Sequence, residues 1–323
     1  MRVLCADAAE ASLIAGLTDL GHEVDVNAGL TAEALPAEIV GYDVLVVRGT
    51  KVSAETIAAG DRLRLIVRAG SGYNTIDVDA ASAAGISVTN VPGRNAVAVA
   101  ELTLGLLLAM DRQIPLASEQ LHHGQWDKKR FSVAAGVHGR TLGIIGFGGI
   151  GRAVAERAFA FGLHVITLAR PSRDALGMSA IERLGIEVVE PHAELIRRSD
   201  ILTLHVPGSA DTRHLIGAEE LADLGSTGIL INTSRGDVVD EVALLSALNG
   251  GLRAGLDVFD DEPTAGKAEW TSLIAAHPNV VATPHIGAST EQAQQAVASG
   301  VVDLVGAFGR GESIPLVNEP RRS

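Results

Sequence analysis

A pattern typical of a buried strand, residues 141–145 (Thr-Leu-Gly-Ile-Ile), runs directly into a glycine-rich turn. The turn contains Gly146, Gly148 and Gly151, and residues 152–161 that follow have the composition of a helix. This is a GxGxxG motif between a strand and a helix, the context in which the motif binds a dinucleotide. The first glycine permits the tight turn, the second lets a pyrophosphate approach the backbone, and the third lets helix and strand pack closely. The N–H groups at the helix start favour phosphates. We therefore expect cofactor contacts from Gly146, Gly148, Gly149, Ile150 and Gly151.

Short apolar runs alternate with alanine-rich helical stretches along most of the chain. The pattern predicts strands at 3–6, 24–27, 44–48, 65–68 and 87–90, and again at 141–145, 164–168, 187–189, 201–205, 228–232, 255–258 and 280–282. It predicts helices at 8–20, 54–60, 77–84, 96–110, 152–161 and 290–308. Strands separated by helices form parallel, doubly wound sheets, so the expected fold class is α/β. A chain of 323 residues is too long for one ordinary core and suits two domains.

Composition and charge exclude several classes of protein. A formal net charge of −13 argues against nucleic-acid binding, which needs clustered Lys and Arg. The single cysteine, Cys5, lies in an apolar run and fits a buried structural thiol in a reducing compartment. The longest apolar segment, 96–110, contains Glu101 and is too short to span a bilayer, and no signal-peptide pattern precedes it. His122 and His123 have no further ligands at metal spacing. We therefore expect a cytoplasmic protein without a metal, a membrane or a nucleic-acid partner.

The strand predicted at 164–168 bears on which dinucleotide fits. In NAD-binding folds this strand normally ends in Asp or Glu, whose carboxylate accepts a hydrogen bond from the ribose 2′-OH. Here the position holds Ala169, followed by Arg170 and Arg173. Without a carboxylate a 2′-phosphate is not repelled, and two guanidiniums can bind it with charge-assisted hydrogen bonds. The sequence therefore favours NADP(H) over NAD(H). The alternative is two solvated arginines and unselective NAD binding.

Three polar residues follow predicted strands in the second half of the chain: Arg235, Glu262 and His285. Ligands of open α/β sheets bind at the carboxyl ends of the strands, so these side chains can converge on one crevice. A 2-oxo acid has a carboxylate that Arg235 can bind and a carbonyl that it can polarise. After hydride transfer the new alkoxide needs a proton, which His285 can give, while Glu262 stabilises and orients the imidazolium. Each residue alone has an ordinary structural explanation; together, downstream of the glycine turn, they indicate a 2-hydroxy-acid dehydrogenase.

With these motifs the chain resembles the D-isomer specific 2-hydroxyacid dehydrogenase family. The similarity lies in segments 68–72, 90–102, 146–151, 205–207, 232–240, 257–263 and 284–290. It implies a flavodoxin-like substrate domain made of residues 1–95 and 287–323, with a Rossmann-type dinucleotide domain, residues 96–286, inserted in it. It also implies a homodimer in which the helix at 96–110 takes part.

The resemblance extends to individual residues. It implies Arg235, Glu262 and His285 as the catalytic residues, and Asp257 as the partner of the nicotinamide carboxamide. The remaining implied cofactor contacts are His205, Val206, Pro207, Thr212, Thr233, Ser234 and Gly287. Backbone N–H groups of Ser71 and Gly72 are expected to bind the substrate carboxylate, with Asn95 as a further substrate contact.

The substrate is less constrained than the chemistry. Segments 47–52, 111–115, 124–131 and 285–290 resemble family members that act on 3-phosphoglycerate and 3-phosphohydroxypyruvate. Arg48 and Lys51, with Lys128, Lys129 and Arg130 contributed by a partner subunit, could neutralise a phosphate dianion; otherwise 128–130 is a solvated run of charges.

Two departures keep other functions open. Ala169 is not the acidic residue of an NAD enzyme, and the chain, ending at Ser323, has the length of a short form without a regulatory domain. An NADPH-dependent hydroxypyruvate or glyoxylate reductase is therefore the alternative. A dinucleotide-sensing corepressor without catalysis is a second alternative, which the intact catalytic trio disfavours.

Overall fold

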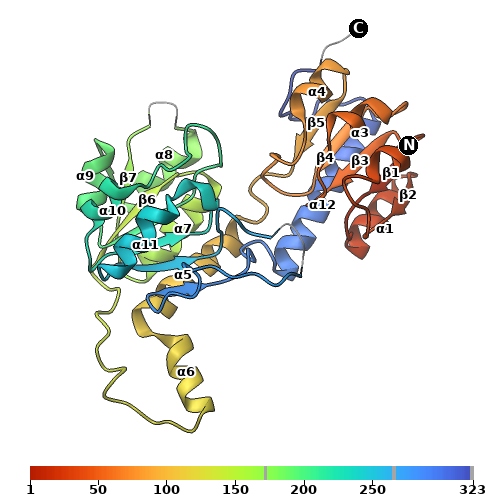
Figure 1. Cartoon of the computed structure of the whole chain (residues 1–323). Helices are drawn as coiled ribbons and strands as arrows, with labels where there is room; N and C mark the ends of the chain where they lie inside the picture. Colours follow the sequence, from red (N-terminus) through yellow and green to blue (C-terminus); the bar gives the residue numbers. More distant parts are fainter. Residues whose placement is uncertain (171–172, 264–266, 321–323) are drawn as a thin grey trace. The chain divides into compact units, whose positions relative to one another are not determined.

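The computed structural model describes residues 1–170, 173–263 and 267–320. The chain divides into two units, Met1–Asn95 with Ser289–Ser323, and Ala96–Ala288 (Figure 1). The second boundary falls after Ala288, whereas the sequence predicted it between residues 286 and 287. Within the described residues, no helix has both the length and the apolar character that crossing a bilayer requires.

The first unit is a five-stranded parallel sheet in the order β2-β1-β3-β4-β5, which is the flavodoxin-like order. Its elements are β1 (Arg2–Cys5), α1 (Ala11–Asp19), β2 (Glu23–Val26), α2 (Leu35–Glu38), β3 (Val44–Val47), α3 (Ala54–Ala59), β4 (Leu65–Arg68), α4 (Val78–Ala83), β5 (Ser87–Asn90) and α12 (Glu291–Gly309). Helix α12, blue in Figure 1, returns to this unit, where its apolar residues pack with α1 against one face of the sheet. Strand β3 is buried along its whole length because both faces of the sheet are covered.

The second unit is a seven-stranded parallel sheet in the order β12-β11-β10-β9-β6-β7-β8, a Rossmann-type arrangement with one further strand. Its elements are α5 (Ala96–Arg112), α6 (Ile114–His122), β6 (Thr141–Ile145), α7 (Gly149–Ala160), β7 (His164–Leu168), α8 (Ala175–Leu184), β8 (Glu187–Val189), α9 (His192–Arg197), β9 (Ile201–Leu204), α10 (Ala218–Leu224), β10 (Ile229–Asn232), the 3-10 helix η1 (Gly236–Val238), α11 (Glu241–Asn249), β11 (Arg253–Leu256) and β12 (Val280–Ala282). The doubly wound α/β fold expected from the alternation of strands and helices is thereby confirmed.

Several elements differ from the expected ones. In the described part of the chain, six helices were not predicted, and each has ten residues or fewer, too short for a clear apolar period: α2, α6, α8, α9, α10 and α11. The polar stretch after residue 110 contains α6. The residue before this helix, Gln113, has a left-handed backbone conformation, and no residue of the helix is buried. Its apolar residues Ile114 and Leu121 are exposed, and the polar composition of the stretch did not indicate a packed helix. Strand β11 begins at Arg253, earlier than expected, because Arg253 to Leu256 pair with the whole of β10.

Candidate active site

The glycine turn lies where the direction of the strand order reverses, between β6 and its neighbours β9 and β7. A Cβ at Gly146, whose φ is +95°, would lie 2.4 Å from the carbonyl oxygen of His205, and one at Gly151 would lie 2.2 Å from the carbonyl oxygen of Gly146. Both positions therefore require glycine. Gly148, the N-cap of α7, faces open space instead, and it leaves the first N–H groups of the helix accessible. The turn fits a dinucleotide pyrophosphate.

Arg173, after β7, lies against this turn. Its guanidinium carbon is 5.1 Å from the ring centre of Phe147, and the guanidinium donates to the carbonyl of Leu168. Burial, followed by the nearby charge of Arg170, lowers the pKa of Arg173. Asp174 caps α8 and pairs with Arg152 at 3.1 Å. Arg173 is thus held at the end of β7, and Arg170 is exposed beside it.

The loop that carries Arg235 is fixed by a buried asparagine. Asn232, 1% exposed at the end of β10, accepts from the backbone N–H and hydroxyl of Ser234 at 3.0 and 2.7 Å and donates to the carbonyl of Arg235 at 2.8 Å. Thr233 is hydrogen-bonded to Thr103 of α5 at 3.0 Å. Sequence reasoning did not single out Asn232; its signal is an amide that ends an otherwise apolar strand.

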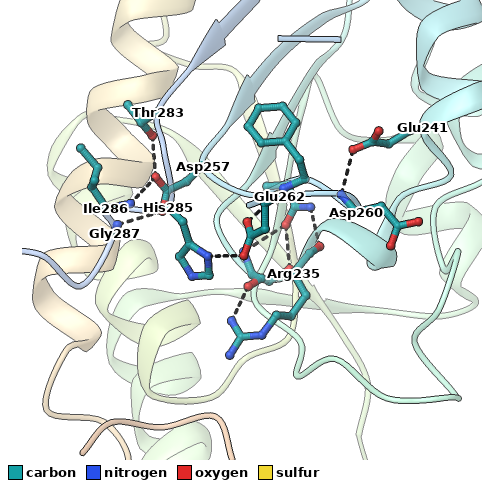
Figure 2. A network of polar contacts seen from close by, with 12 residues as sticks. Arg235, Glu241, Asp257, Asp260, Glu262, Thr283, His285, Ile286 and Gly287 are labelled. Atoms are coloured by element: carbon teal, nitrogen blue, oxygen red, sulfur yellow. Dashed lines mark hydrogen bonds and ion pairs between the residues drawn. The ribbon is translucent and has the colours of Figure 1, made fainter. Parts of the chain in front are cut away.

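The loop that carries His285 is organised by Asp257. This carboxylate, 1% exposed at the end of β11, accepts from the Thr283 hydroxyl at 2.6 Å and from the backbone N–H groups of Ile286 and Gly287 at 2.8 Å (Figure 2). His285 adopts a φ of +52°, a conformation that costs free energy and persists only where surrounding bonds enforce it. The Asp257 carboxylate therefore shapes the histidine loop, and its expected contact with a nicotinamide carboxamide stays a prediction.

His285 and Glu262 form a short polar contact, 2.6 Å between the imidazole Nδ1 and a carboxylate oxygen. The other oxygen of Glu262 accepts from the N–H of Phe259 at 3.4 Å. Figure 2 shows the Arg235 side chain next to this pair. With Nδ1 donating to the carboxylate, Nε2 is the nitrogen that can exchange a proton with a ligand. The pair is partly open to solvent, with 46% of the histidine side chain exposed.

His205, the first residue after β9, lies behind the glycine turn. Its Nε2 is 3.0 Å from the Thr203 hydroxyl, and its Nδ1 is covered. Burial lowers the pKa of His205 to about 3, so the imidazole is neutral in the folded protein at neutral pH. After Val206, Thr212 donates its hydroxyl to the carbonyl of Pro207 at 2.7 Å and closes the turn between these two residues.

We expect this neutral histidine to make the protein sensitive to acid. Its folded pKa lies below the ordinary value of 6.5, so the unfolded chain takes up a proton first as the pH falls. Below pH 6.5, stability should decrease by at most about 1.4 kcal/mol per pH unit from this residue. Urea unfolding of the parent and of His205→Gln, at about pH 7 and about pH 5, measures the difference. An equal loss of stability in both proteins would contradict the assignment.

The expected substrate residues of the first unit lie at the carboxyl edge of its own sheet. Arg48 and Lys51 follow β3, and the Asp7 carboxylate accepts from the N–H of Arg48 at 2.6 Å, which shapes that loop. After β4, the Ser71 hydroxyl donates to Asn95 at 3.2 Å, and Gly72 follows in the same turn. Asn90, not singled out from the sequence, donates to the carbonyl of Ser71 at 2.6 Å.

The charged residues 128–130 belong to the other unit, in the loop after α6. Lys128, Lys129 and Arg130 are exposed, and the Arg130 N–H donates to Asp127 at 3.0 Å. Among the residues that the structure describes, no group of three His, Cys, Asp or Glu side chains could hold a metal ion.

The part of the chain that contains the glycine turn, Arg235, Glu262 and His285 matches a known protein family. Residues 104–287, more than half of the chain, match the NAD-binding domain of the D-isomer specific 2-hydroxyacid dehydrogenases. The chain belongs to this family.

Individual proteins of known name are also similar to this chain. The D-3-phosphoglycerate dehydrogenase of Methanocaldococcus jannaschii is 42% identical over 97% of the chain, but the chain spans only 58% of that protein. The hydroxypyruvate reductase of Thermotoga maritima is 44% identical over 85% of the chain and 88% of its own length. Among solved structures, the NADPH-dependent glyoxylate/hydroxypyruvate reductase of Sinorhizobium meliloti with NADP and malonate aligns over 100% of the chain and 99% of its own, with a TM-score of 0.84 and 32% identity.

Proposed function

We propose that this protein is an oxidoreductase that interconverts a small D-2-hydroxy acid and its 2-oxo form. The observation that carries the proposal is the 2.6 Å contact between His285 and Glu262, in a chain with the dinucleotide-binding domain of the 2-hydroxyacid dehydrogenases. This contact makes a proton donor available at His285 on the same sheet edge as the glycine turn. A corepressor that only senses a dinucleotide has no need for such a pair.

The reaction follows from the chemistry of the three side chains. The nicotinamide, when bound, supplies or accepts the hydride. In reduction, the Arg235 guanidinium binds the substrate carboxylate and polarises the C2 carbonyl, and it stabilises the negative charge that develops on that oxygen. The Nε2 proton of His285 passes to the oxygen, while Glu262 stabilises the imidazolium and holds its ring plane. In oxidation the neutral imidazole takes the hydroxyl proton instead.

We propose 3-phosphoglycerate and 3-phosphohydroxypyruvate as the substrate pair. The loop after β3, with Arg48 and Lys51, would bind the phosphate, and N–H groups of Ser71 and Gly72 the carboxylate. Relatives named D-3-phosphoglycerate dehydrogenase at 42% identity support this choice. The second candidate is hydroxypyruvate or glyoxylate, because a relative of similar identity is named hydroxypyruvate reductase.

A homodimer is part of the proposal. Helix α6 has no buried residue, and exposed apolar side chains on it and after it include Ile114 at 52%, Leu121 at 54% and Trp126 at 81%. A second copy covering this segment would remove them from water and bring Lys128–Arg130 to its neighbour. Analytical ultracentrifugation tests the state.

A panel of four assays tests the function. It combines NADH or NADPH with 3-phosphohydroxypyruvate or hydroxypyruvate and compares kcat/KM. We expect kcat/KM for 3-phosphohydroxypyruvate to be about tenfold or more above that for hydroxypyruvate. A charge-assisted contact to the phosphate is worth at least about 1.5 kcal/mol. The reverse order would make the reductase function correct, and no turnover in any of the four would overturn both.

For the cofactor we propose a preference for NADP(H). Ala169 leaves the end of β7 without a carboxylate, and Arg173 lies against the glycine turn with Arg170 beside it. The NADP-bound relative of Sinorhizobium meliloti supports the possibility in this fold.

The double change Arg170→Ser and Arg173→Ser is expected to raise the NADPH dissociation constant by about 10- to 100-fold and that of NADH by about twofold. Two charge-assisted hydrogen bonds to a phosphate account for the difference. Fluorescence titration with each nucleotide measures both constants. The matched control is Arg197→Ser with Arg198→Ser at the C-terminal end of α9, two surface arginines paired with Glu194 and Glu187. Equal weakening of both nucleotides would remove the arginines from cofactor selection.

A further inference from the structure

Two segments of the candidate active site are packed directly against each other. One runs from Arg235 through η1 to the start of α11, and the other is the loop after β11 that carries Glu262. A Cβ at Gly236 would lie 1.9 Å from the carbonyl carbon of Phe259, so the two backbones touch at a position that only glycine allows. The spacing between the Arg235 loop and the Glu262 loop is therefore set by direct contact.

Glu241 makes the polar contact that accompanies this packing. Its carboxylate, in the first turn of α11, accepts from the backbone N–H of Asp260 at 3.0 Å (Figure 2). The side chain is half-buried, and burial raises the pKa of Glu241, with the charges of Asp261 and Asp260 adding to the effect. Arg213 is a cation 4.0 Å from Asp260. A carboxylate kept here among other acids costs free energy, which the hydrogen bond and the helix N-terminus partly offset.

The contact reaches the catalytic pair through a short turn. Asp260 is two residues before Glu262, and Glu262 folds back so that its carboxylate accepts from Phe259, the residue before Asp260. A shift of the Asp260 backbone therefore moves the backbone of Glu262, and it also moves the Phe259 N–H that donates to the Glu262 carboxylate. The 2.6 Å bond from Glu262 to His285 depends on that position.

We propose that Glu241 is a positioning residue for the Glu262–His285 pair, acting through the Asp260 N–H. The proposal rests on the proposed function. Its role needs an oxygen acceptor at this position and does not need the negative charge. This distinguishes it from an electrostatic role, in which the charge itself would favour the imidazolium.

Two variants of the full-length protein separate these roles. Glu241→Ala removes the acceptor, whereas Glu241→Gln keeps an oxygen and removes the charge. We expect Glu241→Ala to lower the reductive kcat by about tenfold and to move its falling alkaline limb to lower pH by about half a unit to one unit, because a loosely held Glu262 stabilises the imidazolium less. Glu241→Gln should stay within about twofold of the parent. Glu219→Ala, an exposed glutamate in the first turn of α10, is the control.

A double variant tests the route through Glu262. If Glu241 acts through that residue, Glu241→Ala added to Glu262→Gln should lower kcat no further, since residues that act as one unit are not additive. Full multiplication of the two effects, or equal damage from Glu241→Gln and Glu241→Ala, would overturn the proposal.

A measurement that does not depend on enzyme turnover tests the positioning role separately from the proposed function. The NMR titration midpoint of the His285 imidazole should fall in Glu241→Ala and not in Glu241→Gln. That result in a protein without dehydrogenase activity would uphold the positioning role and reject the function. Unchanged midpoints in both variants would reject the positioning role.

Discussion

Replacing Arg235 with alanine is expected to lower kcat/KM for reduction of the 2-oxo acid by about 1,000-fold or more. One guanidinium is assigned both the substrate carboxylate and the developing charge on the carbonyl oxygen, and loss of a single such donor commonly costs about 100- to 1,000-fold. Arg235→Lys should recover only a small part, because a lysine keeps the charge but not the planar fork that binds a carboxylate at two points. Steady-state kinetics with the best substrate of the panel measures the loss.

The cofactor site provides the check on specificity for this variant. The Arg235 loop keeps its fold through Asn232, whose bonds involve the backbone and Ser234 and not the guanidinium. The NADPH dissociation constant should therefore remain within about twofold of the parent. Arg197→Ala, at a surface ion pair of α9, should leave kcat/KM unchanged. If Arg235→Ala keeps kcat/KM within about tenfold of the parent, the assignment of Arg235 is wrong.

Replacing His285 with asparagine is expected to lower the reductive kcat by about 100- to 10,000-fold, the usual contribution of a positioned general acid. Asparagine suits this test because it tolerates the left-handed conformation that His285 adopts at φ +52°. The bonds from Asp257 that hold the loop should then survive. The remaining activity should lose the pH dependence that titration of an imidazole imposes.

A pH–rate profile of the variant, measured beside that of the parent, tests this role. His164→Asn is the matched control, since His164 is exposed at the start of β7, at the opposite edge of the sheet from the carboxyl ends. Glu262→Gln should give a smaller loss than His285→Asn, because the glutamate stabilises the imidazolium without transferring the proton itself. A His285→Asn profile with the shape and height of the parent's would remove the histidine from the reaction.

Much of the fold could be predicted from local patterns. Strands β4, β6 and β7 have the bounds that apolar runs indicated. Buried parallel strands leave such continuous runs because both of their faces are covered. Helix α6 could not be predicted in the same way, since its residues bury nothing.

Some residues of the candidate site could be predicted from the sequence, and others could not. Arg235, Glu262 and His285 could be chosen because each follows an apolar strand and has a side chain suited to the chemistry. Asn232 and Glu241 could not, because an amide at a strand end and a glutamate in a first helical turn are common in any α/β protein. Their importance appears only in their partners, Ser234 and Asp260.

The sequence by itself determined the class of fold and the position of the glycine turn, and it indicated Glu262 and His285 as candidates for proton transfer. These depend on chemistry and on spacing within one strand–turn–helix unit, which are local properties of the chain. Only the tertiary structure decided that Glu262 contacts Nδ1 of His285, that Asp257 is engaged with the histidine loop, and that Gly236 lets two site loops touch. Such contacts join residues far apart in sequence, and their distances follow from how the strands align in the sheet.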